Sequence, residues 1–409
     1  MSAVRAPLKA LDAALAELLA QAAPLAGTET VSTFEADGRV LAQDLISALQ
    51  VPPQDNSSMD GYAVRSSEIA DEGVVLPVSQ RIPAGGAAVP LAPGSAARIF
   101  TGATVPAGAD AIVMQEDTEA VGEQSVRILR VPEPGQWVRR AGEDVRRGAV
   151  VLARGDRLTA AALGLAASIG LDRLEVTRRP RVALFSTGDE LVMPGQVAPE
   201  QMKPGAIYNS NRFFLSALLR RLGCEVSDFG IVPDRRDATR QALADAAQGH
   251  DLILTSGGVS VGEEDHVKPA VESLGSLALW QIAMKPGKPF AYGRVGAAHF
   301  MGLPGNPVSS FITFLLLVRP FLLKLQGATQ LAPDAMQLPA HFSWPRADKR
   351  REFLRVRRNA QGGLDLFPNQ SSGVLTSAVW SDGLVDNAAG RTIAQGDLVP
   401  FMSLAELLS

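Results

Sequence analysis

The sequence predicts a multidomain protein in which a doubly wound, mostly parallel α/β domain stands between a small all-β module and a C-terminal β domain. The chain has 409 residues, enough for roughly two to four domains. From about residue 178, strand-like and helix-like segments alternate, which is typical of a mostly parallel sheet. Before and after that region, short β-branched runs are separated by proline and glycine, which indicates small β units.

Composition and charge exclude several classes of protein. Apolar residues make up 46% of the chain and charged residues 20%, which is a globular rather than a disordered or fibrous composition. The net charge of −4 argues against a dedicated nucleic-acid binder, because such proteins need a concentrated basic face. A single cysteine, Cys224, excludes an internal disulfide framework, and the four histidines are too scattered to suggest a zinc site.

Neither a signal peptide nor a membrane span is expected. Lys9, Asp12 and Glu17 interrupt the apolar residues of the N-terminus, so this region is typical of an amphipathic helix. The most apolar segment, FITFLLLVRPFLLKL, is broken at Arg319-Pro320 and is too short to cross a bilayer. We therefore expect a cytoplasmic protein.

Two helices are predicted on either side of the first β module. Leucines at helical spacing predict a helix over residues 6–23. A second helix is expected over residues 157–170, where Thr159 would be the N-cap and Gly170 the stop.

The alternating region predicts its elements in order. A strand (RVALFST), a helix (NRFFLSALLRRLG), a strand (CEVSDFGIV), a helix (RRDATRQALADAA), a strand (DLILTS) and a helix (EDHVKPAVESLG) are followed by two strands, ALWQIAM and HFMGL. A closing helix is expected in PVSSFITFLLLVRPFLLKLQ. Strands return in KRREFLRVRR, GLDLFP and DLVPFMSL, separated by Asn/Gly turns.

These elements set the expected domain boundaries. Residues 1–44 and 146–177 form one discontinuous helical and linker domain, and residues 45–145 form a β domain inserted into it. The α/β domain covers residues 178–327, and the C-terminal β domain covers residues 328–409.

Polar loops follow the strands of the predicted α/β domain. Ligands bind beyond the carboxyl ends of the strands in an open parallel sheet, and the loops expected there read STGDEL, PDRRD, TSGGVSVGEED, MKPGKPF and GLPGNPVSS. Glycine amides and serine hydroxyls ahead of a helix in SGGVSVGEED predict a site for phosphate. Neither a Walker A loop nor G-x-G-x-x-G spacing is present. The alternative is ordinary turn chemistry, since many turns need glycine.

Acidic residues in these loops allow two interpretations. Glu263, Glu264 and Asp265 would repel a bare phosphate, so Mg²⁺ could bridge carboxylates to the phosphate, with Glu190 sharing the ion. Alternatively, acids at this position only complement the dipole of the following helix.

Lysines supply the opposite charge. Lys285 and Lys288 lie on a turn that contains two prolines, and their ammonium groups would suit a polyanionic ligand. They could instead be solvated turn residues. The basic strand KRREFLRVRR could offer a second anionic contact, although a solvated face is the simpler reading.

An acidic and serine-rich stretch, Asp55–Arg65 (DNSSMDGYAVR), precedes the first strand of the β module. Taken alone, it predicts a turn, because aspartate and asparagine initiate turns and Asp60-Gly61 closes one.

Long motifs in chain order point to one known family. They are DNSSMDGYAV, RIFTGATVPAGAD, RRAGEDV, FSTGDEL, NSN, TSGGVSVGEEDHVK, KPGKPFAYG, GLPGNPVSS and NQSSGVLTS. Together they resemble the molybdopterin molybdenumtransferase (MoeA) family, which includes the C-terminal domain of gephyrin, over nearly the whole chain. The resemblance implies an elongated homodimer with a C-terminal β-barrel, whose active cleft lies between the molybdopterin-binding α/β domain of one subunit and the inserted β domain of the other. It implies Mg²⁺-dependent insertion of molybdate into adenylylated molybdopterin, with release of AMP and molybdenum cofactor.

The same resemblance assigns roles to residues of this chain. It implies catalytic roles for Asp60, Thr101, Asp144, Glu190, Asp265, Lys285 and Lys288. It implies substrate contacts by Ser57, Ser58, Thr187, Gly188, Asp234, Ser256, Gly257, Gly258, Ser260, Gly262, Pro304, Gly305, Asn306 and Ser377. Glu190 and Asp265 would hold Mg²⁺. The chain departs from the family pattern at Arg235, where a second acid is usual, at His266, where tyrosine is usual, and in WSDGLVDN.

Two other functions share part of this pattern. A molybdopterin adenylyltransferase would use the same α/β module, but the flanking helical and β domains favour the molybdenum-inserting type. A scaffold for a membrane receptor tail, as in gephyrin, would leave the acidic cleft loops unexplained. The expected partners are a second copy of the chain, a molybdopterin adenylyltransferase and molybdoenzymes that accept the cofactor, without nucleic acid or membrane.

Overall fold

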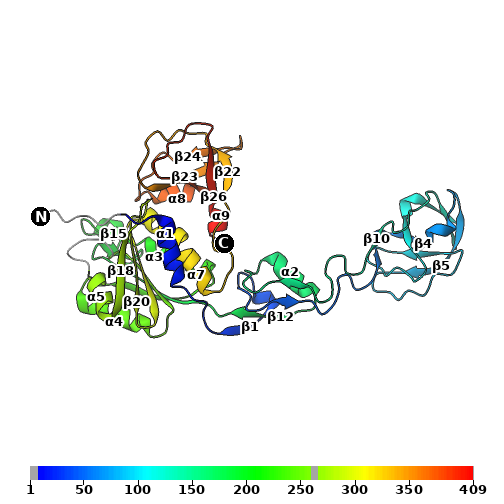
Figure 1. Ribbon diagram of the computed structural model, residues 1–409, viewed down its shortest axis with the longest axis horizontal. Helices are drawn as coiled ribbons and strands as arrows, with labels where there is room; N and C mark the ends of the chain where they lie inside the picture. The colour runs from blue at the N-terminus through cyan, green and yellow to red at the C-terminus, as the bar shows by residue number, and fades with distance from the viewer. Residues whose placement is uncertain (1–7, 259–265, 409) are drawn as a thin grey trace.

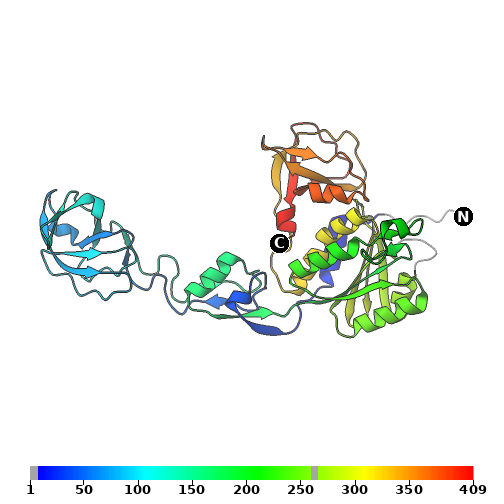
Figure 2. The same ribbon diagram turned by 180° about the vertical axis from the view of Figure 1, so that it is seen from behind.

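The protein is elongated, with its folded units strung along one direction. The computed structural model describes residues 8–258 and 266–408. Figure 1 shows the α/β unit and the C-terminal β unit side by side at one end, a narrow linker with helix α2 (Ala160–Ser168) in the middle, and the inserted β unit at the far end. Figure 2, seen from behind, shows the same separation between the inserted unit, which holds strand β4 (Gly61–Val64), and the α/β sheet.

A six-stranded sheet forms the centre of the α/β unit, in the order β16-β13-β17-β21-β20-β18. The first four strands are parallel, β20 runs antiparallel to both of its neighbours, and the edge strand β18 runs in the direction of the first four. The mostly parallel sheet is therefore confirmed, with one antiparallel strand, β20. Its strands are β13 (Arg181–Thr187), β16 (Glu225–Val232), β17 (Leu252–Ser256), β18 (Gly275–Gln281), β20 (Pro289–Val295) and β21 (Ala298–Leu303).

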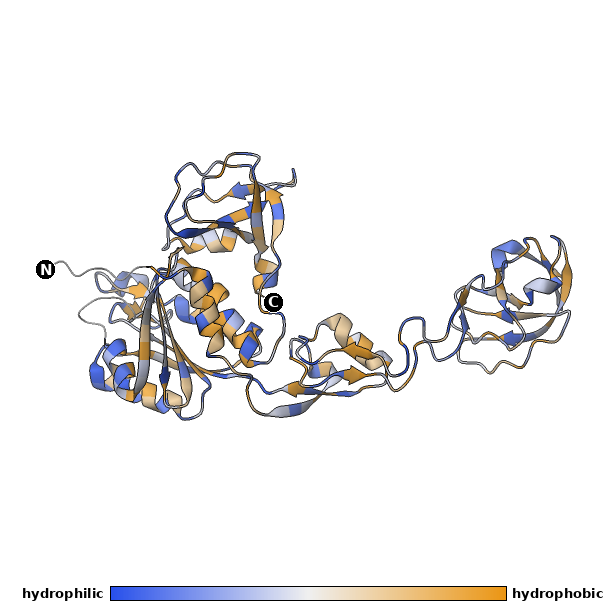
Figure 3. Ribbon diagram, in the orientation of Figure 1, coloured by the Kyte–Doolittle hydropathy of each residue, from blue (hydrophilic) through white to orange (hydrophobic). Residues whose placement is uncertain are grey.

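Helices cover both faces of this sheet, which makes it doubly wound. Alternate side chains of β13 face opposite cores: Phe185 packs in the core under α4 and α5, and Leu184 packs in the core that holds α1, α3, α6 and α7. Figure 3 shows how hydrophobic residues concentrate in the helices packed beside the sheet. The helices are α1 (Leu11–Ala20), α3 (Asn211–Arg221), α4 (Arg236–Ala247), α5 (Val267–Leu274), α6 (Pro307–Thr313) and α7 (Arg319–Leu325).

The closing helix predicted for PVSSFITFLLLVRPFLLKLQ is confirmed, and it continues past Arg319-Pro320 without interruption. One turn of π-helix, η5 (Phe314–Val318), joins α6 directly to α7, and Pro320 falls in the first turn of α7. A π turn inserts an extra residue into the hydrogen-bond ladder, which lets the helix continue past a residue that cannot donate. The resulting helix, Pro307–Leu325, is long and apolar enough to cross a membrane, but 83% of it is buried inside the protein. Its apolar character is therefore that of a core helix.

Chain segments far apart in sequence build the linker. β1 (Thr28–Ser32) pairs antiparallel with β12 (Arg173–Thr177), and β2 (Leu45–Ile46) pairs with β11 (Val150–Leu152). Helix α2 (Ala160–Ser168) packs its alanines against them. The Thr159 hydroxyl accepts a hydrogen bond from the backbone of Ala162, as the N-cap prediction requires. The N-terminal helix, in contrast, shares the core of the α/β sheet.

The inserted unit is all β, as the punctuation of its sequence predicts. Its six-stranded sheet runs in the order β7-β4-β6-β5-β9-β8. The strands are β4 (Gly61–Val64), β5 (Val75–Ile82), β6 (Ala96–Ile99), β7 (Ala111–Met114), β8 (Thr118–Val121) and β9 (Ser125–Ile128), and β3 (Asn56–Ser57) pairs with β10 (Val138–Arg139) beside them. Short 3-10 helices lie within the inserted unit at η2 (Ser66–Glu68) and η3 (Gln115–Asp117). Two others lie outside it, η1 (Thr33–Glu35) and η4 (Pro199–Gln201).

The C-terminal unit closes into a barrel-like ring. Strands β24, β23, β25, β26 and β22 pair in turn, and a bridge from Ala340 to Leu364 returns the chain beyond β22 to β24. The edge strand β19, which belongs to the loop after β18, joins β23 in parallel. The elements are β19 (Met284–Lys285), β22 (Met336–Pro339), β23 (Arg351–Arg358), β24 (Leu364–Leu366), α8 (Leu375–Trp380), β25 (Gly383–Asn387), β26 (Leu398–Ser403) and α9 (Leu404–Leu407).

Candidate active site

A cavity of about 800 Å³ lies at the carboxyl edge of the parallel sheet. The loops after β13, β16, β17 and β21 meet there, because parallel strands end on the same edge. The structure thereby brings together predicted site residues from four separate motifs. They are Thr187, Gly188, Glu190, Asp234, Ser256, Gly257, Gly258, Pro304, Gly305 and Asn306.

Asparagines after β15 complete the cavity wall. Strands β14 (Leu191–Val192) and β15 (Ile207–Tyr208) form a small ribbon beside the cavity. The Nδ2 atom of Asn211 donates to Ser256 Oγ and to the carbonyl of Gly305, each at 2.7 Å, and so ties two strand-end loops together. Asn209 also lines the cavity. Sequence reasoning did not assign these residues to the site, although the motif NSN was a signal for them.

Two polar side-chain atoms in the wall are left for a ligand. Thr187 Oγ1 and Asn209 Nδ2 are buried and have no hydrogen-bond partner within the described residues. Leaving such groups unpaired costs about 1–3 kcal/mol each, unless a bound molecule or water satisfies them. Both can donate a hydrogen bond, so they suit an anionic or carbonyl-bearing ligand.

Glycines let the loop after β17 approach β13 closely. Gly257 has a φ of +91°, and a Cβ there would lie 2.7 Å from the carbonyl oxygen of Thr187. Gly258 has a φ of +66°, and a Cβ there would lie 2.5 Å from Val267 Cγ2. A larger residue at either position would displace the chain, so the cavity wall depends on glycine here.

The carboxylate of Glu190 folds back over the same edge. A Cβ on Gly188 would lie 2.5 Å from Glu190 Oε2, so the carboxylate lies directly against this backbone, and the φ of +139° at Gly188 favours glycine. Glu190 and Asp234 both line the cavity. Within the described residues no group of at least three His, Cys, Asp or Glu side chains could hold a metal. Mg²⁺ commonly uses one or two carboxylates together with waters and substrate phosphates, so this sparse set fits Mg²⁺.

Three predicted residues of the glycine-rich loop, Ser260, Gly262 and Asp265, lie outside the described residues. The expected pairing of Asp265 with Glu190 around a metal therefore remains a prediction. His266 and Arg235, where the chain departs from the family pattern, are the N-cap residues of α5 and α4.

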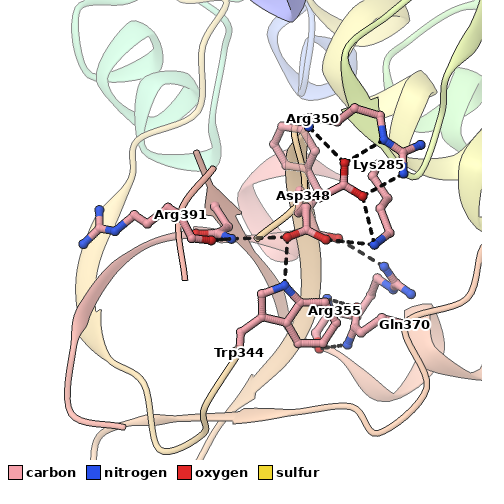
Figure 4. A network of polar contacts seen from close by, with 10 residues as sticks. Lys285, Trp344, Asp348, Arg350, Arg355, Gln370 and Arg391 are labelled. Carbon is pink, nitrogen blue, oxygen red and sulfur yellow. Dashed lines mark hydrogen bonds and ion pairs between the residues drawn. The ribbon is translucent and has the colours of Figure 1, made fainter. Parts of the chain in front are cut away.

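The two predicted lysines have different surroundings. Lys285 Nζ lies 3.0 Å from Glu352 Oε1 and 3.4 Å from Asp348 Oδ2, both in the C-terminal unit (Figure 4). Lys288 is half-buried and forms no ion pair in the described part of the chain. The next residue, Pro289, lines the cavity. Lys288 is therefore the lysine of this loop whose charge is available to an anionic ligand.

Asp60 and Thr101 are brought together in the inserted unit. The backbone N–H and the hydroxyl of Thr101 both donate to Asp60 Oδ1, at 2.8 Å each. These hydrogen bonds hold the pKa of Asp60 below its usual value. Within one chain, however, β4 lies at the far end of the molecule from the α/β sheet (Figure 1). A single chain therefore does not bring Asp60 to the cavity that Glu190 lines.

Other predicted residues serve the local fold. Ser57 and Ser58 donate their hydroxyls to the backbone carbonyls of Met59 and Trp137, at 2.6 Å and 2.8 Å. Asp55 accepts hydrogen bonds from Arg140 and from the backbone of Ala141, as expected for a turn residue.

Two more predicted site residues, Asp144 and Ser377, lie away from the 800 Å³ cavity at the sheet edge. Asp144 is exposed at a separate cavity of about 400 Å³ beside the linker. Ser377 is fully buried in the C-terminal unit, where its hydroxyl donates to the carbonyl of Val374 and accepts from Arg355. The nearby loop does reach the cavity, because Gly373 lines it and Ser372 accepts a hydrogen bond from Val308.

Family models match this chain along most of its length. The MoeA N-terminal region (domain I and II) matches residues 9–170, a probable molybdopterin binding domain matches residues 183–324, and the MoeA C-terminal region (domain IV) matches residues 337–404. The flanking matches distinguish this chain from a protein that has the α/β module alone.

Individual proteins agree with these models. A molybdopterin molybdenumtransferase from Haemophilus influenzae is 43% identical over 334 residues, which are 81% of this chain and 80% of that protein. A gephyrin from Dictyostelium discoideum is 33% identical over 73% of this chain and 47% of its own length. The crystal structure of the molybdopterin biosynthesis MoeA protein from Pyrococcus horikoshii OT3 superposes with a TM-score of 0.83 at 28% identity, covering 97% of this chain and all of that one. The chain therefore belongs to the molybdopterin molybdenumtransferase (MoeA) family, whose enzymes act in molybdenum cofactor biosynthesis.

Proposed function

We propose that this chain inserts molybdate into adenylylated molybdopterin, with Mg²⁺, and releases AMP and molybdenum cofactor. The observation that carries the proposal is the 800 Å³ cavity at the sheet edge, which combines unpaired buried donors with the carboxylate of Glu190. A phosphoanhydride needs such a mixture, because its oxygens accept hydrogen bonds and its charge needs a counter-charge.

The residues of the cavity divide this task. Thr187 and Asn209 donate to ligand oxygens, and Glu190 would hold Mg²⁺ together with the predicted ligand Asp265. Bound Mg²⁺ would neutralise charge on the phosphates. Lys288 contributes a further positive charge from the adjoining loop as the anhydride breaks.

Asp60 and Thr101 support a role for a second copy of the chain. They form a hydrogen-bonded pair on an exposed loop, and they lie far from the cavity of their own chain. In a homodimer with the cleft between subunits, this pair would face the partner's cavity and position molybdate or the anhydride. A molybdopterin adenylyltransferase would supply the substrate, molybdoenzymes would accept the product, and the work would take place in the cytoplasm.

The decisive experiment follows AMP. Purified protein is incubated with adenylylated molybdopterin, Mg²⁺ and molybdate, and we expect AMP release that depends on molybdate. A parallel reaction with ATP and molybdopterin tests for the adenylyltransferase. Adenylylated product in that reaction, or no molybdate-dependent AMP in the first, would contradict the proposed function.

A further inference from the structure

The loop after β18 is shared between the α/β unit and the C-terminal unit. Its strand β19 pairs in parallel with β23, and this pairing places Lys285 beside Glu352. The other end of the loop reaches the cavity, where Pro289 follows Lys288. A contact that fixes the first half of this loop therefore bears on where the second half presents its charge.

Glu352 is an almost fully buried carboxylate, with its side chain 2% exposed. It accepts hydrogen bonds from three donors: Lys285 Nζ at 3.0 Å, Trp344 Nε1 at 2.8 Å and Asn387 Nδ2 at 3.4 Å. Burying a carboxylate is costly unless it is paired and hydrogen-bonded. Lys285 is the cationic donor among these three, so it supplies a counter-charge to this buried carboxylate.

Asp348 engages the same lysine. Its Oδ2 lies 3.4 Å from Lys285 Nζ, and Arg350 holds this carboxylate through two guanidinium nitrogens, at 2.8 Å and 3.0 Å. Lys285 Nζ also lies 5.9 Å from the ring centroid of Trp344. Figure 4 shows the ammonium group of Lys285 directed toward Asp348, while the lysine side chain remains 38% exposed. Two carboxylates already compensate its charge, which leaves little of it for a phosphate in the cavity.

The loop is also fixed from its other side. A Cβ on Gly287 would lie 2.5 Å from Thr313 Oγ1 of α6, so the backbone between the two lysines packs directly on that helix. The backbone N–H of Ile282 donates to the carbonyl of Lys288 at 2.7 Å. The loop thus has one well-defined position between α6 and β23.

We propose that Glu352 is a positioning residue, which acts through Lys285 to fix this loop so that Lys288 is presented at the cavity. Lys285 then joins the C-terminal unit to the catalytic edge, in place of the direct phosphate contact that the sequence predicts for it. The inference rests on the proposed function for the identity of the anionic substrate.

A double-mutant cycle tests this division of roles. Lys285→Met, Glu352→Gln and the double variant are compared by the kcat and KM of AMP release. We expect each single change to lower kcat by about tenfold. The double variant should lose no more activity than the less active of the two single variants, because both changes break the same contact. If Lys285→Met costs far more than Glu352→Gln, and the two losses multiply in the double variant, Lys285 contacts the substrate directly and the proposal is overturned.

A second measurement does not depend on the reaction. Amide hydrogen exchange of residues 282–290 is followed by mass spectrometry in the ligand-free protein. We expect faster exchange in Glu352→Gln and no change in Asp382→Asn, a matched control that removes a carboxylate paired with Arg358 at the opposite end of β23. Where a single variant fails to fold, the double variant carries the test, since it leaves no unpaired buried charge. If residues 282–290 of the double variant exchange at the wild-type rate, the proposal is overturned. If the wild-type chain releases no AMP, only the proposed function is contradicted.

Discussion

Asp60 combines an exposed carboxylate with two hydrogen bonds from one residue, Thr101. Its lowered pKa keeps it ionised at neutral pH. We expect Asp60→Ala to reduce AMP release by about 100-fold, because a misplaced reacting group costs this much. The free energy of unfolding should change by no more than about 0.5 kcal/mol, since the side chain is on the surface. Rate assays and urea unfolding measure the two effects, and a loss of activity matched by a loss of stability would favour a structural role.

His299 predicts a pH-dependent stability. It is 7% exposed, its Nδ1 lies 2.9 Å from the Tyr292 hydroxyl, and burial lowers its pKa to about 4. Burial is the largest cause of this lowered pKa, the positive charge of Arg294 contributes to it, and Asp251 acts in the opposite direction. Between pH 4 and pH 6.5 the unfolded chain binds the proton and the native chain does not, so stability falls as the pH falls through this window.

At pH 5 the expected loss is about 2 kcal/mol relative to neutral pH. His299→Asn keeps a hydrogen-bonding side chain and removes the titration. Urea unfolding of both proteins at about pH 7.5 and about pH 5 measures the difference. Equal pH dependence of the two proteins would show that His299 is not the responsible group.

At the scale of elements, the alternation of strand-like and helix-like segments along the sequence predicts most of the α/β sheet, but not every strand. Residues 289–295 begin with proline and contain glycine, so no strand was predicted there, yet β20 pairs on both sides with β18 and β21. Pairing with two neighbours overrides a weak local preference. The predicted closing helix, by contrast, is confirmed, because a π turn and a buried environment keep it continuous past Pro320.

The loop after β17 gives a prediction about backbone geometry. Gly257→Ala would combine a positive φ with a contact of 2.7 Å to the carbonyl of Thr187. We expect a loss of about 1–3 kcal/mol in the free energy of unfolding, and a raised KM for the adenylylated substrate. Gly170→Ala is a matched control, because Gly170 has a φ of +86° but nothing within 4 Å of the added Cβ. If the two variants lose equal stability in urea, the close contact contributes nothing.

At the scale of the whole molecule, the sequence predicts the edge of the site better than its surroundings. The polar loops converge because parallel strands end on one edge, a rule that needs no side-chain detail. The partner of Lys285 could not be predicted in this way, since Glu352 is 67 residues away and belongs to another folded unit. The inserted unit poses the same difficulty, because only the arrangement of two chains can bring Asp60 to a cavity.

Complementation between two inactive chains tests that arrangement. Asp60→Ala damages the inserted unit and Glu190→Ala damages the cavity, so each homodimer should be inactive. In a mixed dimer, one cleft would combine an intact cavity with an intact inserted unit. Refolding the two variants together should therefore restore about a quarter of the wild-type rate of AMP release, since half the dimers are mixed and half of their clefts are whole.

The matched control for this experiment mixes Asp60→Ala with Thr101→Ala. Both changes lie in the inserted unit, so every cleft of every mixed dimer keeps one damaged side, and we expect no recovery. Recovery in the control would mean that the two substitutions do not inactivate the same part of the cleft. No recovery with Asp60→Ala and Glu190→Ala, despite mixed dimers detected by native mass spectrometry, would contradict a cleft between subunits. Asp60 would then have to act within its own chain, which the distance between the inserted unit and the α/β sheet in Figure 1 opposes.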